Sequence, residues 1–261
     1  MIVLEDTALY ERLAAFFLLT VRLSAMFVAA PFFSASALSV PMRVAFAMTF
    51  ALVSVASINV PPFDLFSIKG MTLIAQEIII GAAIGLTVQL AFAAVSMAGE
   101  QIAASMGIGF ASMVDPQTGA QSPVLTQFMS IMLLLIFLVI EGHHVLLRHV
   151  VASYGVLPVG GDFLDPKMFL DITKAAGLIF SAAFIIGLPL IAALFFVNII
   201  VGLLTRVAPQ MNIFSIGFPL TILVGFVLLT IALPSISKTI ASFLNVVSQI
   251  TRDVILAGTG K

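Results

Sequence analysis

Long apolar runs, separated by single charged residues or by prolines, dominate the pattern along the chain. A run of about 18 residues or more is long enough to cross the hydrocarbon layer of a membrane as a helix. The alternation of apolar and polar residues that indicates strands is not evident. The pattern predicts an all-α, hydrophobic, multi-helix, membrane-associated protein with six such runs: Leu23–Met42, Val44–Phe63, Ile78–Gly99, Val124–Ile140, Ala175–Thr205 and Val207–Ser237.

The last two runs, Ala175–Thr205 and Val207–Ser237, are longer than one straight crossing requires. A helix of about 31 residues is about 46 Å long, whereas the hydrocarbon layer is about 30 Å thick. Pro189 removes a backbone hydrogen bond in the middle of the first of these runs, so a kink is expected there. We therefore expect long, kinked helical hairpins.

Prolines lie mostly at the edges of the apolar runs, where helices are expected to begin or end. The clearest hydrophilic loop is Gly155–Asp171, which contains two adjacent glycines and three aspartates. We take it to divide an N-terminal helical part, residues 1–160, from a C-terminal helical part, residues 161–261. After Pro234, apolar residues recur at helical spacing with polar residues between them, which predicts an amphipathic C-terminal helix.

The composition excludes several classes of protein. Hydrophobic residues make up 61% of the chain and charged residues only 9%, far below the quarter or so that is typical of soluble domains. The net charge is -1 and there is no basic run, which excludes nucleic-acid binding. The chain has no cysteine, so disulfides, thiolate metal sites and cysteine nucleophiles are excluded.

Glu77 and Glu100 flank one apolar run, and a carboxylate at membrane depth is a functional candidate by default. A proton relay in a small-solute secondary transporter, built on these two carboxylates and a helix broken at Pro189, is one alternative function. Because both residues lie at the ends of the run, solvated or capped carboxylates are the favoured interpretation. A purely structural membrane scaffold is a further alternative.

Three histidines and a glutamate, Glu141, His143, His144 and His149, raise the question of a metal site. Adjacent histidines point to different faces of a helix, and the i,i+5 spacing from His144 to His149 does not form an ordinary metal-binding pair. We expect no metal, and expect His143 and His144 to cap or hydrogen-bond at a helix end. No nucleotide-binding or catalytic motif is recognisable, so we expect neither an enzyme nor a cofactor.

The segment Gly107–Pro116 is the least regular apolar part of the chain, because glycines and an Asp-Pro pair interrupt a helical pattern. The backbone of such a segment is not satisfied by lipid, so the segment must be buried in protein or line a cavity. Phe110 is flanked in sequence by Met97, Met106 and Met113, whose flexible side chains suit either core filling or a deformable seal. The residues alone favour core filling.

Short motifs in a fixed order resemble the FliR/SpaR/YscT family of type III protein-export gate subunits over nearly the whole chain. The most specific is Arg206-Val207-Ala208-Pro209-Gln210-Met211-Asn212-Ile213-Phe214, followed by Gly217-Phe218-Pro219. Others are Glu77 with Gly81 and Gly85, Ala98-Gly99-Glu100, Met106-Gly107 through Asp115-Pro116, Pro123-Val124-Leu125, Gly142-His143-His144, Leu157-Pro158 and Leu188-Pro189. The flagellar branch of the family is favoured over the virulence branch by general similarity rather than by one residue.

The resemblance implies one subunit of a helical export-gate cone in the flagellar basal body of the bacterial inner membrane. The implied partners are the P and Q export-gate subunits in a hetero-oligomer, the switch protein FlhB outside them, unfolded export substrates and membrane lipid. Residues 1–160 would correspond to a P-like part and residues 161–261 to a Q-like hairpin with an amphipathic tail. The implied function is to form part of the channel, and its plug, for export of flagellar proteins.

The resemblance also assigns roles to individual residues. The loop 106–123 would project into the channel as a plug, which gives gate roles to Met106, Gly107, Gly109, Phe110, Met113, Asp115 and Pro116. A second loop would lie at the cytoplasmic mouth and contains Arg206, Pro209, Gln210 and Asn212. Gly81, Gly85 and Gly99 are expected at helix contacts, since small residues let two backbones approach closely.

Overall fold

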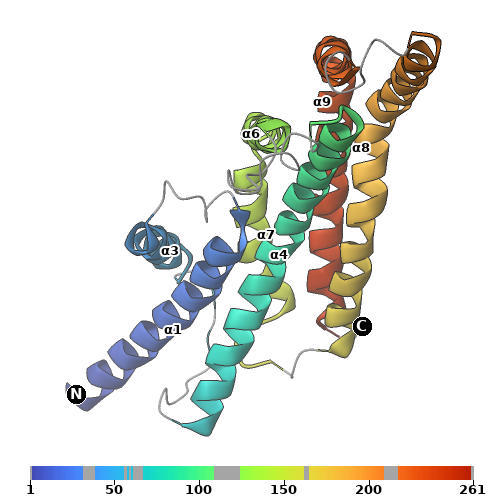
Figure 1. Cartoon of the computed structure of the whole chain (residues 1–261). Coiled ribbons are helices and arrows are strands. Elements are labelled where there is room, and N and C mark those ends of the chain that lie inside the picture. The colour runs from blue at the N-terminus through green and yellow to red at the C-terminus, as the bar shows by residue number, and fades with distance from the viewer. Residues whose placement is uncertain are drawn as a thin grey trace. The chain divides into compact units, whose positions relative to one another are not determined.

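The computed structural model describes residues 2–31, 39–55, 58, 60, 67–108, 124–161, 165–208 and 217–259. In these ranges the regular elements are α-helices, which confirms the predicted all-α class. They are α1 (Ile2–Ala29), α3 (Val40–Ser54), α4 (Ile68–Ser105), α6 (Val124–Val139), α7 (Gly142–Val156), α8 (Pro166–Val207) and α9 (Phe218–Ala257) (Figure 1).

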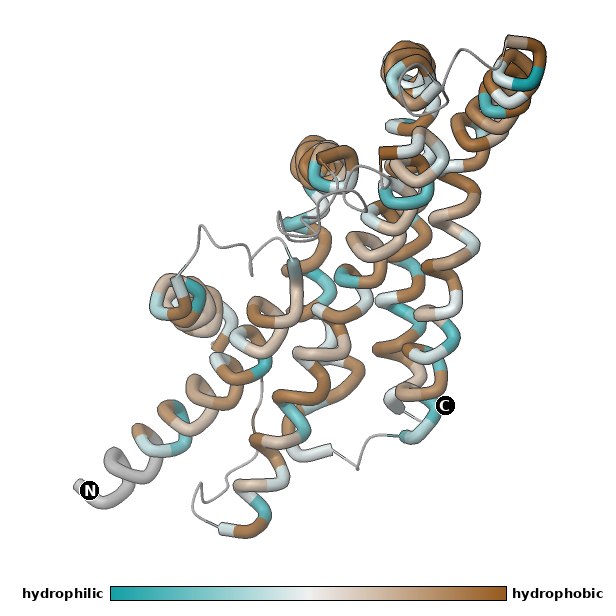
Figure 2. The backbone as a smooth tube through the Cα atoms, in the orientation of Figure 1, coloured by the Kyte–Doolittle hydropathy of each residue, from teal (hydrophilic) through white to brown (hydrophobic). Residues whose placement is uncertain are grey.

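Four described helices are long and apolar enough to cross a membrane, namely α1 from Leu9 onward, α4, α8 and α9. Helices α6 and α7 form a fifth candidate span if they are taken together, with a bend of 66° between them. Apolar residues predominate along these helices (Figure 2). The chain is therefore a multi-span helical membrane protein.

The predicted boundaries are wrong at the first two apolar runs, Leu23–Met42 and Val44–Phe63. Helix α1 begins far upstream, continues through Arg22 and ends at Ala29, while α3 has only 15 residues. Arg22 does not end the helix because Glu77 neutralises its charge inside the protein. The run Val124–Ile140 was placed well, since it corresponds to α6.

Prolines behave in two ways in this fold. Pro41 lies in the first turn of α3 and Pro166 begins α8, where a missing N–H is tolerated because first-turn donors have no partner within the helix. Pro189 and Pro234 lie inside α8 and α9. The predicted helix boundary at Pro234 is therefore wrong, and the amphipathic segment beyond it is the second half of α9.

The chain packs as two compact units. The first unit consists of Met1–Leu90, Glu141–Ala176 and Asn245–Lys261, and the second of Ala91–Ile140 and Gly177–Leu244. Helices α4, α8 and α9 each contribute residues to both units. The division at residue 160 rests on the hydrophilic loop in the sequence and on the family resemblance, and it stays a prediction.

The end of α9 closes the first unit. The backbone N–H of Asp165, directly before α8, donates to the carbonyl of Gly258, directly after α9, at 3.4 Å. Gly258 also lies against Leu157 and Met168. Within this unit, the end of α9 therefore contacts the beginning of α8.

Much apolar surface stays exposed on α8 and on the first half of α9. The exposed aromatic residues of α8 are Phe169, Phe180, Phe184, Phe195 and Phe196, and the large exposed apolar residues in the first half of α9 are Leu220, Leu223, Phe226, Val227 and Ile231. Contiguous apolar surface of this kind marks contact with lipid or with other proteins.

Candidate functional site: a buried ion pair and the end of α4

Arg22 of α1 and Glu77 of α4 form a buried ion pair in the first unit. The Arg22 side chain is 0% exposed and the Glu77 side chain is 2% exposed. Arg22 Nε donates to Glu77 Oε2 at 2.6 Å, and Arg22 Nη2 donates to Oε1 at 2.9 Å. This two-point geometry is the strongest form of an arginine–carboxylate contact.

Helix α7 and the residue after it complete the surroundings of Arg22. Nη1 donates to Ser153 Oγ at 2.9 Å, and Nη2 donates to the carbonyl oxygen of Leu157 at 3.0 Å. The guanidinium carbon lies 3.9 Å from the centre of the Tyr154 ring, and the Tyr154 hydroxyl donates to the carbonyl of Leu19 at 3.3 Å. The charge is thus compensated on all sides, and the cluster joins α1, α4 and α7.

The expectation that Glu77 is solvated or capped at a helix end is therefore wrong, whereas Glu100 is exposed as expected. The error arose because α4 begins at Ile68, so that Glu77 lies inside the helix. The functional reading of the sequence also missed Arg22. A useful signal was present, since one arginine and one glutamate inside long apolar helices are expected to pair with each other.

Gly81 and Gly85 lie where α4 packs directly against α1. A Cβ atom at Gly81 would lie 2.1 Å from the carbonyl oxygen of Arg22, and one at Gly85 would lie 2.6 Å from Ala29 Cβ. In the second unit, a Cβ atom at Gly99 would lie 3.0 Å from the Cα atom of Thr126 on α6. At all three glycines a neighbouring helix occupies the space that a side chain would need.

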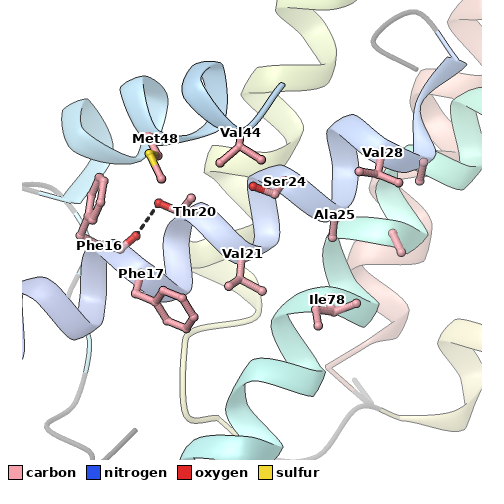
Figure 3. A pocket seen from close by; sticks show the side chains of 12 residues that line it. Phe16, Phe17, Thr20, Val21, Ser24, Ala25, Val28, Val44, Met48 and Ile78 are labelled. Carbon is pink, nitrogen blue, oxygen red and sulfur yellow. Dashed lines mark hydrogen bonds between the residues drawn. The ribbon is translucent and has the colours of Figure 1, made fainter. Parts of the chain in front are cut away.

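An apolar groove of about 570 Å³ lies between α1, α3 and α4 in the first unit (Figure 3). None of the twelve residues that line it is charged, and Thr20 and Ser24 supply its only hydroxyl groups. The Thr20 hydroxyl donates to the carbonyl of Phe16 at 2.8 Å, within its own helix. The groove offers no charged group to a polar solute.

His143 and His144 lie at the start of α7, and His149 lies in the middle of the same helix. The ring centroids of His143 and His144 are 4.1 Å apart, and His144 Nδ1 lies 3.6 Å from Glu141 Oε2. Glu141 precedes the helix with a φ of 56°, at the bend between α6 and α7. Within the part of the chain that the structure describes, no group of three or more metal-ligating side chains is present.

Helix α4 ends in a glycine-terminated turn at the first residues of the predicted plug loop, 106–123. Gly107 has a φ of 80°; its N–H donates to the carbonyl of Ala104 at 3.0 Å, and the N–H of Ile108 donates to that of Ala103 at 3.1 Å. This pair of bonds is a Schellman motif, in which glycine adopts the left-handed conformation without strain. The helix therefore stops at a defined residue.

Helices α8 and α9 hold this end of α4 within the second unit. Asn198 Nδ2 donates to the carbonyl of Ser105 at 2.9 Å, and the Thr221 hydroxyl lies 3.1 Å from the carbonyl oxygen of Met106. The Met106 side chain is buried beside Gly225, where a Cβ atom would lie 2.6 Å from Met106 Cε. A Cβ atom at Gly107 would lie 2.8 Å from the Phe218 ring.

Several predicted site residues fall outside the described residues, so the structure does not place them. They are Gly109, Phe110, Met113, Asp115 and Pro116 of the predicted plug, and Pro209, Gln210 and Asn212 of the predicted mouth loop. Arg206 is described, and it lies exposed in the last turn of α8. Of the predicted gate residues, the structure describes Met106 and Gly107, which are adjacent in the sequence.

Comparison with known proteins gives a consistent result over most of the chain. The model of the family described as bacterial export proteins, family 1, matches residues 13–246. The flagellar biosynthetic protein FliR of Escherichia coli strain K12 is 41% identical over 222 residues, which cover 83% of this chain and 84% of that protein. The chain belongs to the FliR family.

Two other members match over a larger share of the chain. The FliR protein of Pectobacterium carotovorum is 34% identical over 240 residues, 92% of each chain. The FliR protein of Bacillus subtilis strain 168 is 33% identical over 244 residues, 92% of this chain and 94% of that one. The resemblance drawn from the sequence motifs is confirmed, and the FliR family consists of non-enzymatic flagellar export proteins of the membrane.

Proposed function

We propose that this FliR-family protein is a core subunit of the flagellar type III protein export gate and forms part of its channel and plug. The observation that carries the proposal is the end of α4, where Gly107 terminates the helix and Met106 is buried beneath α9. A plug needs a fixed base, and here α8 and α9 hold the last residues before the segment 109–123.

In this proposal the plug comprises Gly109, Phe110, Met113, Asp115 and Pro116, with Met106 and Gly107 as its base. Arg206, Pro209, Gln210 and Asn212 belong to a loop at the cytoplasmic mouth. The mechanism is physical: unfolded export substrates pass through a tight apolar channel, and the plug closes the lumen to ions and small solutes when no substrate is present. Other components supply the energy.

The proposed partners are the P and Q export-gate subunits, the switch protein FlhB, the exported substrates and membrane lipid, within the basal body of the inner membrane. The exposed phenylalanines of α8 and the exposed apolar face of α9 offer surface for contact with both lipid and these subunits. Residues 1–160 would be the P-like part and residues 161–261 the Q-like hairpin of the same cone.

The geometry does not favour a small-solute secondary transporter. Arg22 occupies both carboxylate oxygens of Glu77, Glu100 is exposed, and the groove between α1, α3 and α4 contains no charged side chain. A coupling carboxylate must instead gain and lose a proton or an ion during the transport cycle. Uptake of a solute by vesicles that contain only this chain would revive that alternative.

Deletion of Gly109–Gln117 tests the proposed plug in the assembled complex. The complex should retain all its subunits, as measured by native mass, while the cell membrane becomes permeable to ions. A matched variant that replaces the same residues by alternating glycine and serine keeps the chain length and separates loss of the apolar plug from shortening of the loop; it should leak as well. An intact ion barrier in both variants would refute the plug, and normal export in addition would indicate a structural scaffold.

A further inference from the structure

Two side chains from distant parts of the sequence bond to adjacent backbone carbonyls at the end of α4. Asn198 of α8 donates to the carbonyl of Ser105, and Thr221 of α9 lies within hydrogen-bonding distance of the carbonyl of Met106. The last carbonyls of a helix have no regular partner within the helix, so they need other donors. Here the donors come from two neighbouring helices.

Asn198 is unusual for its position. Its neighbours Phe195, Phe196, Ile199 and Ile200 are exposed apolar residues of a helix that otherwise suits an apolar environment. An amide in such surroundings is costly unless it is hydrogen-bonded. The bond to Ser105 satisfies one of its two donor hydrogens and gives a physical reason for a polar residue at this point of α8.

Thr221 is buried, and its single hydroxyl proton has two acceptors. The hydroxyl oxygen lies 3.1 Å from the carbonyl of Met106 and 2.9 Å from that of Phe218, one turn earlier in α9. Many threonines in helices bond only to their own helix, as Thr230 does with Phe226. Thr221 shares its proton with a second helix, so its hydroxyl connects α9 to α4.

We infer that Asn198 and Thr221 are positioning residues that fix the end of α4 on α8 and α9. Close packing supports the two bonds, because Gly225 makes room for Met106 and Gly107 lies against the Phe218 ring. The direction in which the chain leaves α4 at Ile108 is therefore set by α8 and α9. The consequence for gating, that a shift of these two helices displaces the base of the plug, rests on the proposed function.

Hydrogen–deuterium exchange of the purified export-gate complex tests the positioning role directly. The variants are Asn198→Leu and Thr221→Val, each nearly isosteric, and the two combined. In each single variant, exchange in the peptide that covers residues 102–108 should be about fivefold faster, and in the double variant roughly 20-fold faster, as expected for loss of bonds of ordinary strength. Thr221→Ser keeps the hydroxyl and should restore the rate of the native protein.

Matched controls remove a hydroxyl that bonds only within its own helix. Thr205→Val in α8 and Thr230→Val in α9 meet this condition and should leave exchange in residues 102–108 unchanged. Unchanged exchange in the double variant would overturn the inference. So would equally faster exchange around Arg22, because that result would indicate general destabilisation rather than release of one helix end.

Ion permeability separates this inference from the proposed function. The double variant should assemble and leak ions, although less than the deletion of Gly109–Gln117. A leaking deletion with a tight double variant that shows faster local exchange would overturn the link to gating and leave the plug intact. A tight deletion would refute the plug, while the exchange experiment still decides whether Asn198 and Thr221 hold the end of α4.

Discussion

Arg22 and Glu77 lie 55 positions apart in the sequence and form a two-point ion pair with almost no exposed surface. A buried charge of this kind is stable only while its partner is present, because each ion has lost its contact with water. The pair joins α1 to α4, and the bond from Arg22 to Ser153 adds α7.

Removal of one member of the pair should be far more damaging than removal of both. Arg22→Met or Glu77→Gln alone should destabilise the protein by about 3–5 kcal/mol, whereas Arg22→Met with Glu77→Met should recover much of the loss. Thermal unfolding of the detergent-solubilised protein, followed by size-exclusion chromatography, measures the difference. A double variant as unstable as the worse single one would show that the ion pair is not the source of the effect.

The contact at Gly81 should not tolerate even one methyl group. In Gly81→Ala the new Cβ meets the backbone carbonyl of Arg22, which cannot rotate away, so a loss of roughly 1–3 kcal/mol is expected. Gly155→Ala is the matched control in the same unit, since no atom lies within 4 Å of its Cβ position. The control should be neutral or stabilising by up to about 1 kcal/mol, because alanine favours a helix more than glycine. Equal unfolding temperatures for the two variants would contradict this explanation.

A hydroxyl pair joins α4 to the last part of α9 in the first unit. Thr87 Oγ1 and Thr251 Oγ1 are buried and 2.8 Å apart, and each also lies 2.8 Å from a carbonyl of its own helix. Thr87→Val or Thr251→Val alone should cost about 0.5–1.5 kcal/mol, and the double variant less than the sum, because no single hydroxyl is then left without its partner. A double-mutant cycle of unfolding free energies measures the coupling, and strict additivity would mean that the two hydroxyls do not interact.

The two halves of α9 should face different surroundings in the assembled complex. Leu223 and Ile231, 62% and 72% exposed, lie on the apolar half, whereas exposed polar residues follow at spacings of three and four: Ser235, Lys238, Ser242, Asn245, Gln249 and Arg252. Because the chain has no cysteine, single cysteines can be introduced without background. A charged, membrane-impermeant maleimide should react about tenfold faster at Ser242→Cys and Gln249→Cys than at Leu223→Cys and Ile231→Cys, since the thiolate is the reactive form and apolar surroundings disfavour it.

Labelling after detergent denaturation is the control for this experiment and should make all four cysteines equally reactive. Equal labelling rates for the four cysteines in the native complex would show instead that the exposed polar residues from Ser235 to Arg252 are covered. That result would indicate a protein partner along the whole of α9.

The sequence pattern predicted the helical class, the apolar run Val124–Ile140 that corresponds to α6, and the interruption after Met106, because these depend on local properties. Apolar run length decides whether a segment can be a long helix, and a glycine that adopts positive φ can end one. The motifs also identified the family. The pattern failed at two residues. Arg22 was expected to bound an apolar run but lies inside α1, where contacts with other helices neutralise its charge. Pro234 was expected to bound a helix but lies inside the 40-residue helix α9.

The sequence by itself determined that this protein is an apolar helical membrane protein of the FliR family, since hydropathy and motif order are properties of the linear chain. Only the tertiary structure decided that Glu77 binds Arg22, that Gly81 must remain a glycine, and that Asn198 and Thr221 hold the end of α4. These are contacts between residues tens of positions apart or more. No local pattern specifies them, because the partner of a buried polar group is set by which helices pack side by side.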